Sequence, residues 1–553
     1  MKKYRFQFTH RTESPKEFFW ERFFGMIPGA MSWALLIGFL GLSFVKPLYG
    51  AMAIIAYNLY WLFRILYMTL FLVLAYFVLA VEKETDWIEK CRLLEKGKSS
   101  LPILRRRLKA TRKHFKLLRW VGLRNQEREL KRALAEGLTI PSLDSIYHVV
   151  IIAIARESQE VVEPAIQALT KSHFPTKQII PVLAVEERTG PEKTAMAQEF
   201  KKKYGHHFFD FLIAPHPDGI PGEARVKGAN VTFAAKAAAN YLAAKKIPFE
   251  NVVASCFDAD TVASAEYFIA TTYHFMRHPK RTRASFQPIP VYHNNIWDAP
   301  GFARVLETGS SFFQLIEATN PEKLVTFSSH SMSFKALVEI GYWPVDMISD
   351  DSAIFWKALL HYGGDYRCVP VYVTLSMDVV MAGSFWKTLM NVYKQKLRWA
   401  WGVENFPILM RGFQKDRRIS LFHKIRCIIK MLEMHVSWAS MGFIVTFMGW
   451  MPGLFATREF SSSVLFYNAA QISTVIFNLA LTSFIISVLL SINMLPKHKV
   501  RNSLFTRIVY ALEWLMIPFV FTFLSSMPAL HAQTRLARGK AMEFWVTEKK
   551  RKA

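Results

Sequence analysis

The sequence is poor in cysteine and in acidic residues, and each shortage limits what the protein can be. Its 4 cysteines are scattered along 553 residues without the close spacing of zinc ligands and without obvious partners. This pattern argues against a disulfide scaffold and suits a reducing compartment. Asp and Glu number 43 against 70 Lys and Arg, which gives a formal net charge of +27. So large a basic surplus is typical of proteins that bind nucleic acid or of membrane proteins with basic loops.

Long apolar runs favour the membrane alternative. Hydrophobic residues make up 52% of the chain, and many of them gather into runs near its two ends. Each run has at least the roughly 20 residues that cross a bilayer. The runs cover residues 26–45, 51–81, 431–455, 465–495 and 506–530. The sequence therefore predicts a multi-pass membrane protein whose basic residues meet anionic membrane lipid, with no nucleic acid as a partner.

The charges beside the runs predict an orientation. The first run does not end in the small residues of a cleavage site, so we expect an uncleaved signal anchor. The positive-inside rule puts the N-terminus in the cytoplasm and the chain after residue 81 back in the cytoplasm, at the inner membrane. Five crossings would leave the basic tail outside. Either the last run, which contains Glu513 and Pro518, is re-entrant or a broken hairpin, or a further span escapes detection; we expect a cytoplasmic tail.

Composition divides the chain into six parts. The basic helical part lies on the inner leaflet or packs on the soluble domain, and the two alternatives have equal support. We expect an N-terminal tail with two transmembrane helices (1–81), a basic cytoplasmic helical segment (82–146), an α/β domain (147–402), interfacial helices (403–430), C-terminal transmembrane helices (431–530) and a basic tail (531–553).

Between the two sets of runs, short β-branched segments alternate with helical patterns. Strands are predicted at 148–155, 178–185, 208–214 and 252–254, with helices between them. This alternation predicts an α/β domain with a mostly parallel sheet and helices on both faces. Because such sheets bind ligands beyond the carboxyl ends of their strands, polar residues that follow a strand are candidates for a site.

Two acidic pairs are candidates of this kind. Asp258 and Asp260 follow a predicted strand, where an Asp-x-Asp pair suits a hard divalent cation that also binds phosphate oxygens. A polar turn is the plainer alternative. Asp350 and Asp351 open a predicted helix, where acidic residues also complement the helix dipole. Neither pair identifies a site by itself.

Four motifs in order connect these pairs. Together they resemble the membrane-embedded family-2 glycosyltransferases of the inverting GT-A type, the group of the cellulose, chitin and hyaluronan synthases. The resemblance covers residues 147–402, and the flanking apolar runs suit it. Its motifs are Arg156-Glu157 where the family has Asn-Glu, Asp258-x-Asp260 as D-x-D, Ser349-Asp350-Asp351 where the family has T-E-D, and Gln395-x-x-Arg398-Trp399 as Q-x-x-R-W.

The resemblance implies a role for each motif. Asp351, beside Asp350, would be the base that deprotonates the acceptor hydroxyl. Asp260, with Asp258 nearer the nucleotide, would hold Mg²⁺ or Mn²⁺. The cation and Arg398 would stabilise the leaving nucleoside diphosphate. An interfacial aromatic–cation pair is the alternative for Arg398 and its neighbour in the motif.

Other residues are implied around the two substrates. The donor side would contain Glu157, Lys227, Asn230, and Glu186 or Glu187 at the position of a uracil contact. The acceptor side would contain Gln287, His330, Gln395 and Trp399. The loop 328–331 reads Ser-Ser-His-Ser and lacks the family's glycine. A hydrogen bond in the core is therefore the favoured alternative for the histidine.

The implied function is transfer of a sugar from a nucleotide-diphosphate donor, with a UDP-sugar favoured, to a growing β-linked polysaccharide at the cytoplasmic membrane face. The Q-x-x-R-W motif favours this processive hypothesis. Addition of a single sugar to a lipid carrier or glycolipid is the second hypothesis, and an inactive transport or scaffold protein is the third. We expect no PilZ-like regulatory domain after the last run. The sequence does not identify the donor sugar or the linkage.

Overall fold

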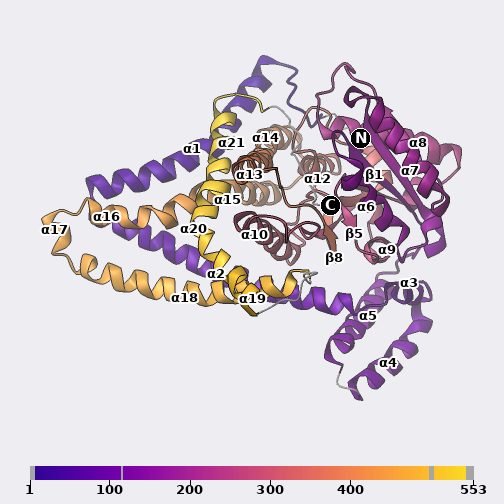
Figure 1. The fold of residues 1–553 in the computed structure, drawn as a ribbon, viewed down its shortest axis with the longest axis horizontal. Coiled ribbons are helices and arrows are strands. Elements are labelled where there is room, and N and C mark those ends of the chain that lie inside the picture. The colour runs from indigo at the N-terminus through magenta and orange to yellow at the C-terminus, as the bar shows by residue number, and fades with distance from the viewer. Residues whose placement is uncertain (1–5, 114–115, 497–503, 543–553) are drawn as a thin grey trace.

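The computed structural model describes residues 6–113, 116–496 and 504–542. An α/β domain lies at one end of the molecule and long helices lie at the other (Figure 1). Most of the basic loop at 496–501 and of the basic tail, at 497–503 and 543–553, lies outside the described residues. The predicted fold class, an α/β domain inserted between apolar helices, is confirmed.

A mixed sheet of eight strands forms the centre of the domain, in the order β3-β2-β1-β4-β7-β6-β8-β5. The pairs β3–β2, β2–β1, β1–β4 and β6–β8 are parallel. β7 is antiparallel to both of its neighbours, and β5 is antiparallel to β8. The strands are β1 (Tyr147–Ile154), β2 (Ile179–Glu186), β3 (Leu212–His216), β4 (Val252–Asp258), β5 (Val262–Ala263), β6 (Ala284–Val291), β7 (His330–Ser333) and β8 (Arg367–Ser376).

Helices cover both faces of the sheet because its central strands are apolar on both sides. In β1, Val149 and Ile151 point into one core, and Val150 and Ile152 point into the other, since successive side chains of a strand alternate. The first core is covered by α8 (Lys227–Ala244), α11 (Phe334–Glu339), α12 (Asp350–His361) and α14 (Asn405–Lys415), and the second by α6 (Gln159–Thr170), α7 (Pro191–Tyr204) and α9 (Tyr267–Arg277).

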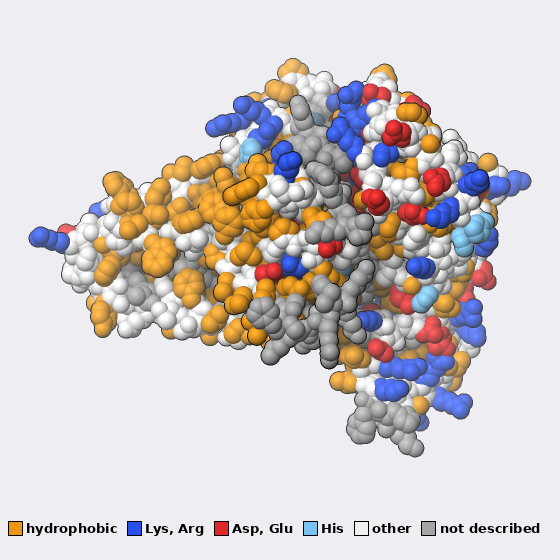
Figure 2. Space-filling view, viewed as in Figure 1, with side chains coloured by type: hydrophobic (Ala, Val, Ile, Leu, Met, Phe, Trp, Pro, Cys, Tyr) orange, Lys and Arg blue, Asp and Glu red, His pale blue; other side chains and the backbone are white. Residues whose placement is uncertain are grey.

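The basic segment before the domain forms a small helical lobe that packs on the second face. Trp87 of this lobe contacts Tyr273 of α9 with ring centroids 5.7 Å apart, and the buried Lys90 lies 3.6 Å from both Glu82 and Glu129. Many of its other Lys and Arg side chains are exposed in Figure 2. Of the two alternatives for this segment, packing on the soluble domain therefore holds for α3 and α5. The lobe consists of α3 (Trp87–Glu95), α4 (Leu101–Lys113) and α5 (Leu117–Ala135).

Among the described residues, five helical stretches are long and apolar enough to cross a membrane. Four of them run lengthwise through the part of the molecule whose surface is apolar in Figure 2. They are α1 (Pro15–Val45), α2 (Pro47–Lys83), α15 (Leu421–Thr446) and α18 (Val464–Met494).

Helix α15 begins before the apolar run at 431–455, and an interfacial position for its first turns stays a prediction. The helix begins at Leu421, inside the stretch 403–430 that was predicted to be interfacial. Exposed Phe422, Ile425 and Ile429 recur at helical spacing with basic residues between them. The basic residues lower the average hydropathy, so the apolar stripe is hidden in a simple scan of the sequence.

The last apolar stretch, Ile508–Ala537, crosses the other four apolar helices in the view of Figure 1. It is broken into α19 (Leu504–Glu513), α20 (Ile517–Phe521) and α21 (Met527–Ala537), with a π-helical turn at 522–526 before α21. The ring of Trp514 stacks on Phe312 of α10 (Gly301–Ala318) at 6.1 Å. At the other end, Arg22 of α1 donates to the carbonyl oxygens of Leu536 and Ala537 at 2.9 and 2.8 Å. The first part of this stretch therefore packs on α10, and its end packs on the first turns of α1.

Candidate active site

A single lysine brings together carboxylates from two separate motifs. The Nζ atom of Lys227, at the first residue of α8, lies 2.8 Å from Asp258 Oδ1 and 2.9 Å from Asp351 Oδ1. Asp350 Oδ2 is 3.9 Å away. Asp258 ends β4, and the other two carboxylates open α12. Two predicted motifs, almost a hundred positions apart, thus share one cation.

The approach of α8 to this point depends on a glycine. A Cβ atom on Gly228 would lie 2.2 Å from the carbonyl oxygen of Pro344 and 3.2 Å from Cβ of Asp350. Any larger residue would push the start of α8 away from the chain that leads into α12. The position of Lys227 therefore follows from the small residue beside it.

The two acidic residues of α12 differ in their surroundings. The side chain of Asp350 is 4% exposed and that of Asp351 is 23% exposed. Burial and the neighbouring Asp351 raise the pKa of Asp350 well above its usual value, and Lys227 and Arg398 partly oppose this rise. Although burial acts the other way, Asp258 and Asp351 hold the pKa of Lys227 above its usual value. The lysine therefore stays charged, and Asp351 is the more accessible carboxylate of the pair.

The loop that lacks a glycine is tied to Asp258 by serine hydroxyls. Ser328 Oγ donates to Asp258 Oδ2 at 2.5 Å, and the Ser329 and Thr261 hydroxyls are 2.7 Å apart. Ser329 has φ +61°, in the left-handed region where glycine is normally favoured. The backbone thus has the conformation that a glycine would take, and the serine side chain adds a contact to the D-x-D loop.

His330 lies beneath this loop. Its ring is fully buried, its Nδ1 atom is 2.9 Å from the carbonyl oxygen of Phe327 and 3.9 Å from Asp351 Oδ1, and burial lowers its pKa. Gln287 holds the same loop, because its Oε1 atom accepts a hydrogen bond from the amide of Phe327 at 2.7 Å. Both predicted acceptor residues therefore support the loop, and direct contact with an acceptor stays a prediction.

Asp260 is held by two residues that sequence reasoning missed. It is 1% exposed, and its Oδ2 atom accepts from the amide of Asp378 at 2.8 Å. Asn294 Nδ2 donates to the carbonyl oxygen of Asp260 at 2.9 Å and to Asp378 Oδ1 at 2.8 Å. Asp378 follows β8, and its position at the carboxyl end of a strand was the signal that could have found it.

Asp258 and Asp260 offer carboxylate oxygens, which are ligands that a divalent cation such as Mg²⁺ prefers. Within the described part of the chain, no group of three or more His, Cys, Asp or Glu residues is arranged to hold a metal ion. Mg²⁺ commonly binds one or two carboxylates and takes its remaining ligands from water and substrate phosphates. Two carboxylates beside a diphosphate site would fit that pattern.

The Q-x-x-R-W motif lies on α13 (Phe385–Ala400). The ring of Trp399 lies 5.9 Å from that of Tyr292, and Lys396 Nζ lies 3.6 Å from the centroid of Trp399. Lys396 forms a buried pair with Glu307 of α10 at 2.9 Å. Gln395 is 3% exposed. Lys396 thus contacts both Glu307 and the ring of Trp399. No motif in the sequence predicted this contact.

Behind α12, a buried glutamate holds the start of the helix. Glu404 Oε1 accepts from the amide and the hydroxyl of Ser349 at 2.8 and 2.7 Å. Its Oε2 atom accepts from Trp401 Nε1 at 2.7 Å and lies 2.9 Å from His10 Nε2. The other ring nitrogen of His10 lies 2.9 Å from Glu21 of α1. No sequence signal links His10 to Glu404, because the two are almost four hundred positions apart.

The remaining predicted donor residues lie along the β1–β2 side of the sheet. Glu157 Oε2 accepts from the amide of Ala155 at 2.7 Å. Glu186 is buried and pairs with Arg188, whereas Glu187 is exposed. Asn230 is 2% exposed and donates to the carbonyl oxygen of Ala184 at 2.9 Å. Contact of a nucleotide with Glu157, Glu186, Glu187 and Asn230 stays a prediction.

Comparison with known proteins gives a matching family model and several similar synthases. Residues 255–527 match the family model described as glycosyl transferase family group 2. A poly-β-1,6-N-acetyl-D-glucosamine synthase of Staphylococcus epidermidis is 24% identical over 269 residues, which cover 48% of this chain and 56% of that protein. The synthase of the same name from Staphylococcus aureus (strain COL) is 30% identical over 173 residues, or 30% of this chain and 39% of the relative. The chain thus spans about half the length, or less, of these curated relatives.

A solved mannosyltransferase from Pyrobaculum calidifontis, in complex with GDP-Man and Mn²⁺, aligns with 76% of this chain and 99% of its own. The two are 14% identical, with a TM-score of 0.38.

Proposed function

We propose that this chain, whose residues 255–527 match the family model described as glycosyl transferase family group 2, is an inverting polysaccharide synthase. It moves a sugar from a nucleotide-diphosphate donor to a growing β-linked chain. The observation that carries the proposal is the position of Lys227 between Asp258 and Asp351. Inverting transfer needs a group that helps to bind the donor diphosphate and a catalytic base. Asp258 is proposed for the first role and Asp351 for the second, and Lys227 contacts both.

In the proposed reaction, Asp351 takes the proton of the acceptor hydroxyl as that oxygen attacks the anomeric carbon. The new carbon–oxygen bond forms while the bond to the diphosphate breaks on the opposite face, so the linkage is inverted. Lys227 and Arg398 stabilise the negative charge that develops on the leaving diphosphate. A divalent cation held by Asp260 and Asp258 would supply further Lewis-acid stabilisation of that charge.

Lys227 also couples donor binding to release of the base. Its ammonium is shared between Asp258 and Asp351 at 2.8 and 2.9 Å. The diphosphate of a nucleotide sugar carries two negative charges, against one on each carboxylate, and it competes for the same ammonium. Donor binding therefore draws Lys227 from Asp351 and leaves that carboxylate available to the acceptor.

UDP-N-acetylglucosamine is the first donor to test, because the relatives are named as poly-β-1,6-N-acetyl-D-glucosamine synthases. The purified chain is incubated with a panel of radiolabelled nucleotide sugars and Mg²⁺ or Mn²⁺, and the product is sized. A long polymer supports the proposal. A single added sugar would favour transfer to a lipid carrier or glycolipid, and no turnover with any donor would favour an inactive scaffold.

The base is tested by Asp351→Asn, with Asp365→Asn as the control. Asp365 pairs with Lys280 and Arg283 on the surface, so this control makes the same chemical change away from the site. Asp351→Asn should abolish transfer while calorimetry shows donor binding no weaker than in the unmodified chain. Retained turnover in this variant would remove Asp351 as the base.

We further propose that four helices cross the cytoplasmic membrane and that the fifth apolar stretch, residues 508–537, does not. Its first part packs on α10 through Trp514, and its end contacts Arg22 in the first turns of α1, next to the predicted cytoplasmic N-terminus. Four crossings put both termini and the catalytic domain on the cytosolic side, in agreement with the positive-inside rule. A reporter fused after residue 553 should be active only in its cytosolic form; activity of a periplasmic reporter there would mean an odd number of crossings.

A further inference from the structure

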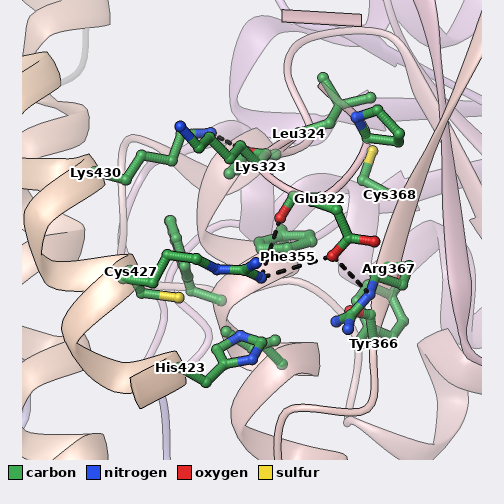
Figure 3. A pocket seen from close by; sticks show the side chains of 15 residues that line it. Glu322, Lys323, Leu324, Phe355, Tyr366, Arg367, Cys368, His423, Cys427 and Lys430 are labelled. Carbon is green, nitrogen blue, oxygen red and sulfur yellow. Dashed lines mark hydrogen bonds and ion pairs between the residues drawn. The ribbon is translucent and has the colours of Figure 1, made fainter. Parts of the chain in front are cut away.

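A cavity of about 30 Å³ lies where α15 meets the α/β domain, away from the acidic cluster (Figure 3). Its apolar wall contains Leu324, Phe355 of α12 and Tyr366 at the start of β8, all buried. Its charged side contains Arg367 and Arg426. The cavity thus combines an apolar wall with two guanidinium groups from different parts of the chain.

The anion that now lies between the two arginines is weakly held. Glu322 Oε2 is 3.9 Å from Arg367 Nε and 3.7 Å from Arg426 Nη2, and its side chain is 65% exposed. Both distances exceed hydrogen-bond range, and exposed ion pairs of this kind contribute about 0–1 kcal/mol. A phosphodiester carries the same single negative charge as this carboxylate, and its two free oxygens suit the planar fork of arginine. Glu322 therefore marks an anion position that a phosphate group can take over.

Basic side chains beside this position outnumber the acidic ones. Lys323 and Lys430 also line the cavity, where Glu322 is the acidic residue. Lys430 is already engaged, since it bonds the carbonyl oxygen of Lys323 and lies 3.2 Å from Glu317. The lysines therefore add positive potential, and the two arginines supply the donors.

The helix that forms one wall of the cavity also presents an apolar stripe to its surroundings. Phe422, Ile425 and Ile429 of α15 are 77%, 45% and 59% exposed. The cavity-lining residues of α15 are His423, Arg426, Cys427 and Lys430, which share an adjacent face of the same helix. Because α15 is one of the candidate membrane spans, this exposed stripe would be available to lipid acyl chains. A phospholipid lying along the stripe would carry its phosphate to Arg426.

We propose that Arg367 and Arg426 bind the phosphate of an anionic phospholipid whose acyl chains lie along the exposed stripe of α15. The ligand chemistry is that of a phosphodiester, and the neighbouring apolar stripe selects a lipid over a soluble phosphate. Binding would join the first turns of α15 to α12, because Phe355 and Arg426 line the same cavity. The lipid would thereby fix the catalytic domain against the membrane. This site is independent of the proposed sugar transfer.

The test uses the full chain in nanodiscs of phosphatidylcholine with and without phosphatidylglycerol, with bound lipid counted by native mass spectrometry. Arg426→Gln and Arg367→Gln should each weaken phosphatidylglycerol retention about fivefold, as expected for loss of one basic contact to anionic lipid. Glu322→Gln removes the competing carboxylate and should strengthen retention. The control is Arg225→Gln, an exposed arginine paired with Asp218 on the soluble domain, which should leave retention unchanged.

Each outcome decides for or against the lipid site. Opposite effects of Glu322→Gln and Arg426→Gln support it, and equal retention in Arg426→Gln and Arg225→Gln would overturn it. The Glu322→Gln variant adds a gain in binding, which misfolding cannot imitate. Inorganic phosphate is added in a separate arm: if it displaces phosphatidylglycerol from the site as readily as the lipid itself does, the site takes soluble phosphate and the lipid assignment is wrong.

Discussion

Replacing His10 with alanine should loosen the helix that carries the proposed base, although His10 lies far from that base in the chain. His10 joins Glu21 of α1 to Glu404, each at 2.9 Å. Glu404 in turn holds the amide and hydroxyl of Ser349, directly before Asp350 and Asp351. Glu404 is 3% exposed at its side chain, so it would lose its charged partner in a place that water reaches poorly.

The magnitude follows from these contacts. A hydrogen bond to a charged group contributes about 1.5–3 kcal/mol, and the His10 side chain is 32% exposed, which screens part of its interaction. We therefore expect His10→Ala to lower the free energy of unfolding by about 2–3 kcal/mol. Small displacements of catalytic groups can slow a reaction by about a hundredfold. We expect kcat to fall by about ten- to a hundredfold, with a smaller change in the donor KM.

The pH dependence has a definite sign. Burial disfavours the charged form of His10, but Glu21 and Glu404 outweigh that effect and raise the pKa of His10 from 6.5 to about 10. A group with a raised pKa in the folded state stabilises fully below its unfolded pKa and loses its contribution as the pH rises through the folded value. The Tm of the unmodified chain should therefore exceed that of His10→Ala most clearly below pH 6.5, and the difference should shrink toward pH 10.

The assay compares thermal unfolding in detergent with steady-state turnover, and Arg11→Ala is the matched control. Arg11 lies in the same segment but donates to the carbonyl oxygen of Gly222 at 2.5 Å, away from Glu404. A His10→Ala/Glu404→Gln double variant should show coupling between the two positions. If His10→Ala and Arg11→Ala have the same Tm and kcat at every pH, the contacts of His10 do not stabilise the start of α12 and the prediction is wrong.

Three further substitutions test other contacts of the site. Gly228→Ala should abolish turnover and lower Tm strongly, because the new Cβ would lie 2.2 Å from the carbonyl oxygen of Pro344. Lys396→Met should cost about 3–5 kcal/mol by leaving Glu307 charged and buried, and adding Glu307→Leu should restore most of the Tm. Ser329→Gly should change stability by less than about 1 kcal/mol, since relief at φ +61° offsets the lost hydroxyl contact with Thr261; donor KM, measured by initial rates, should still rise because the D-x-D loop is less restrained.

The sequence predicted those parts of the site that depend on local position. Asp258 at the end of a strand and Asp351 at the start of a helix can be located from hydrophobic pattern and motif, and the structure brings both to Lys227. The α/β class followed from strand and helix alternation in the same way. Local patterns of this kind survive folding because they depend on near neighbours in the chain.

Contacts between distant segments were not predictable in that way. Asn294 and Asp378 hold Asp260 through loops that follow different strands, and nothing in the spacing of these residues shows that the loops meet. The continuity of α15 from Leu421 into the apolar run at 431–455 was hidden for a different reason. Its apolar stripe is narrow and mixed with basic side chains, so that only the periodicity of exposed residues reveals it.

Both helices that carry the proposed acceptor and base residues are connected to the same turn of α1. From Glu21, contacts lead through His10 and Glu404 to the start of α12. From the next residue, Arg22, they lead to the end of α21. In the first half of the same helix, His531 Nδ1 lies 3.1 Å from the hydroxyl of Tyr393 on α13. A shift of α1 would therefore displace the base and the Q-x-x-R-W helix together. Since α1 is a candidate membrane span, the geometry of the proposed sugar-transfer site would depend on the position of the first helix in the bilayer.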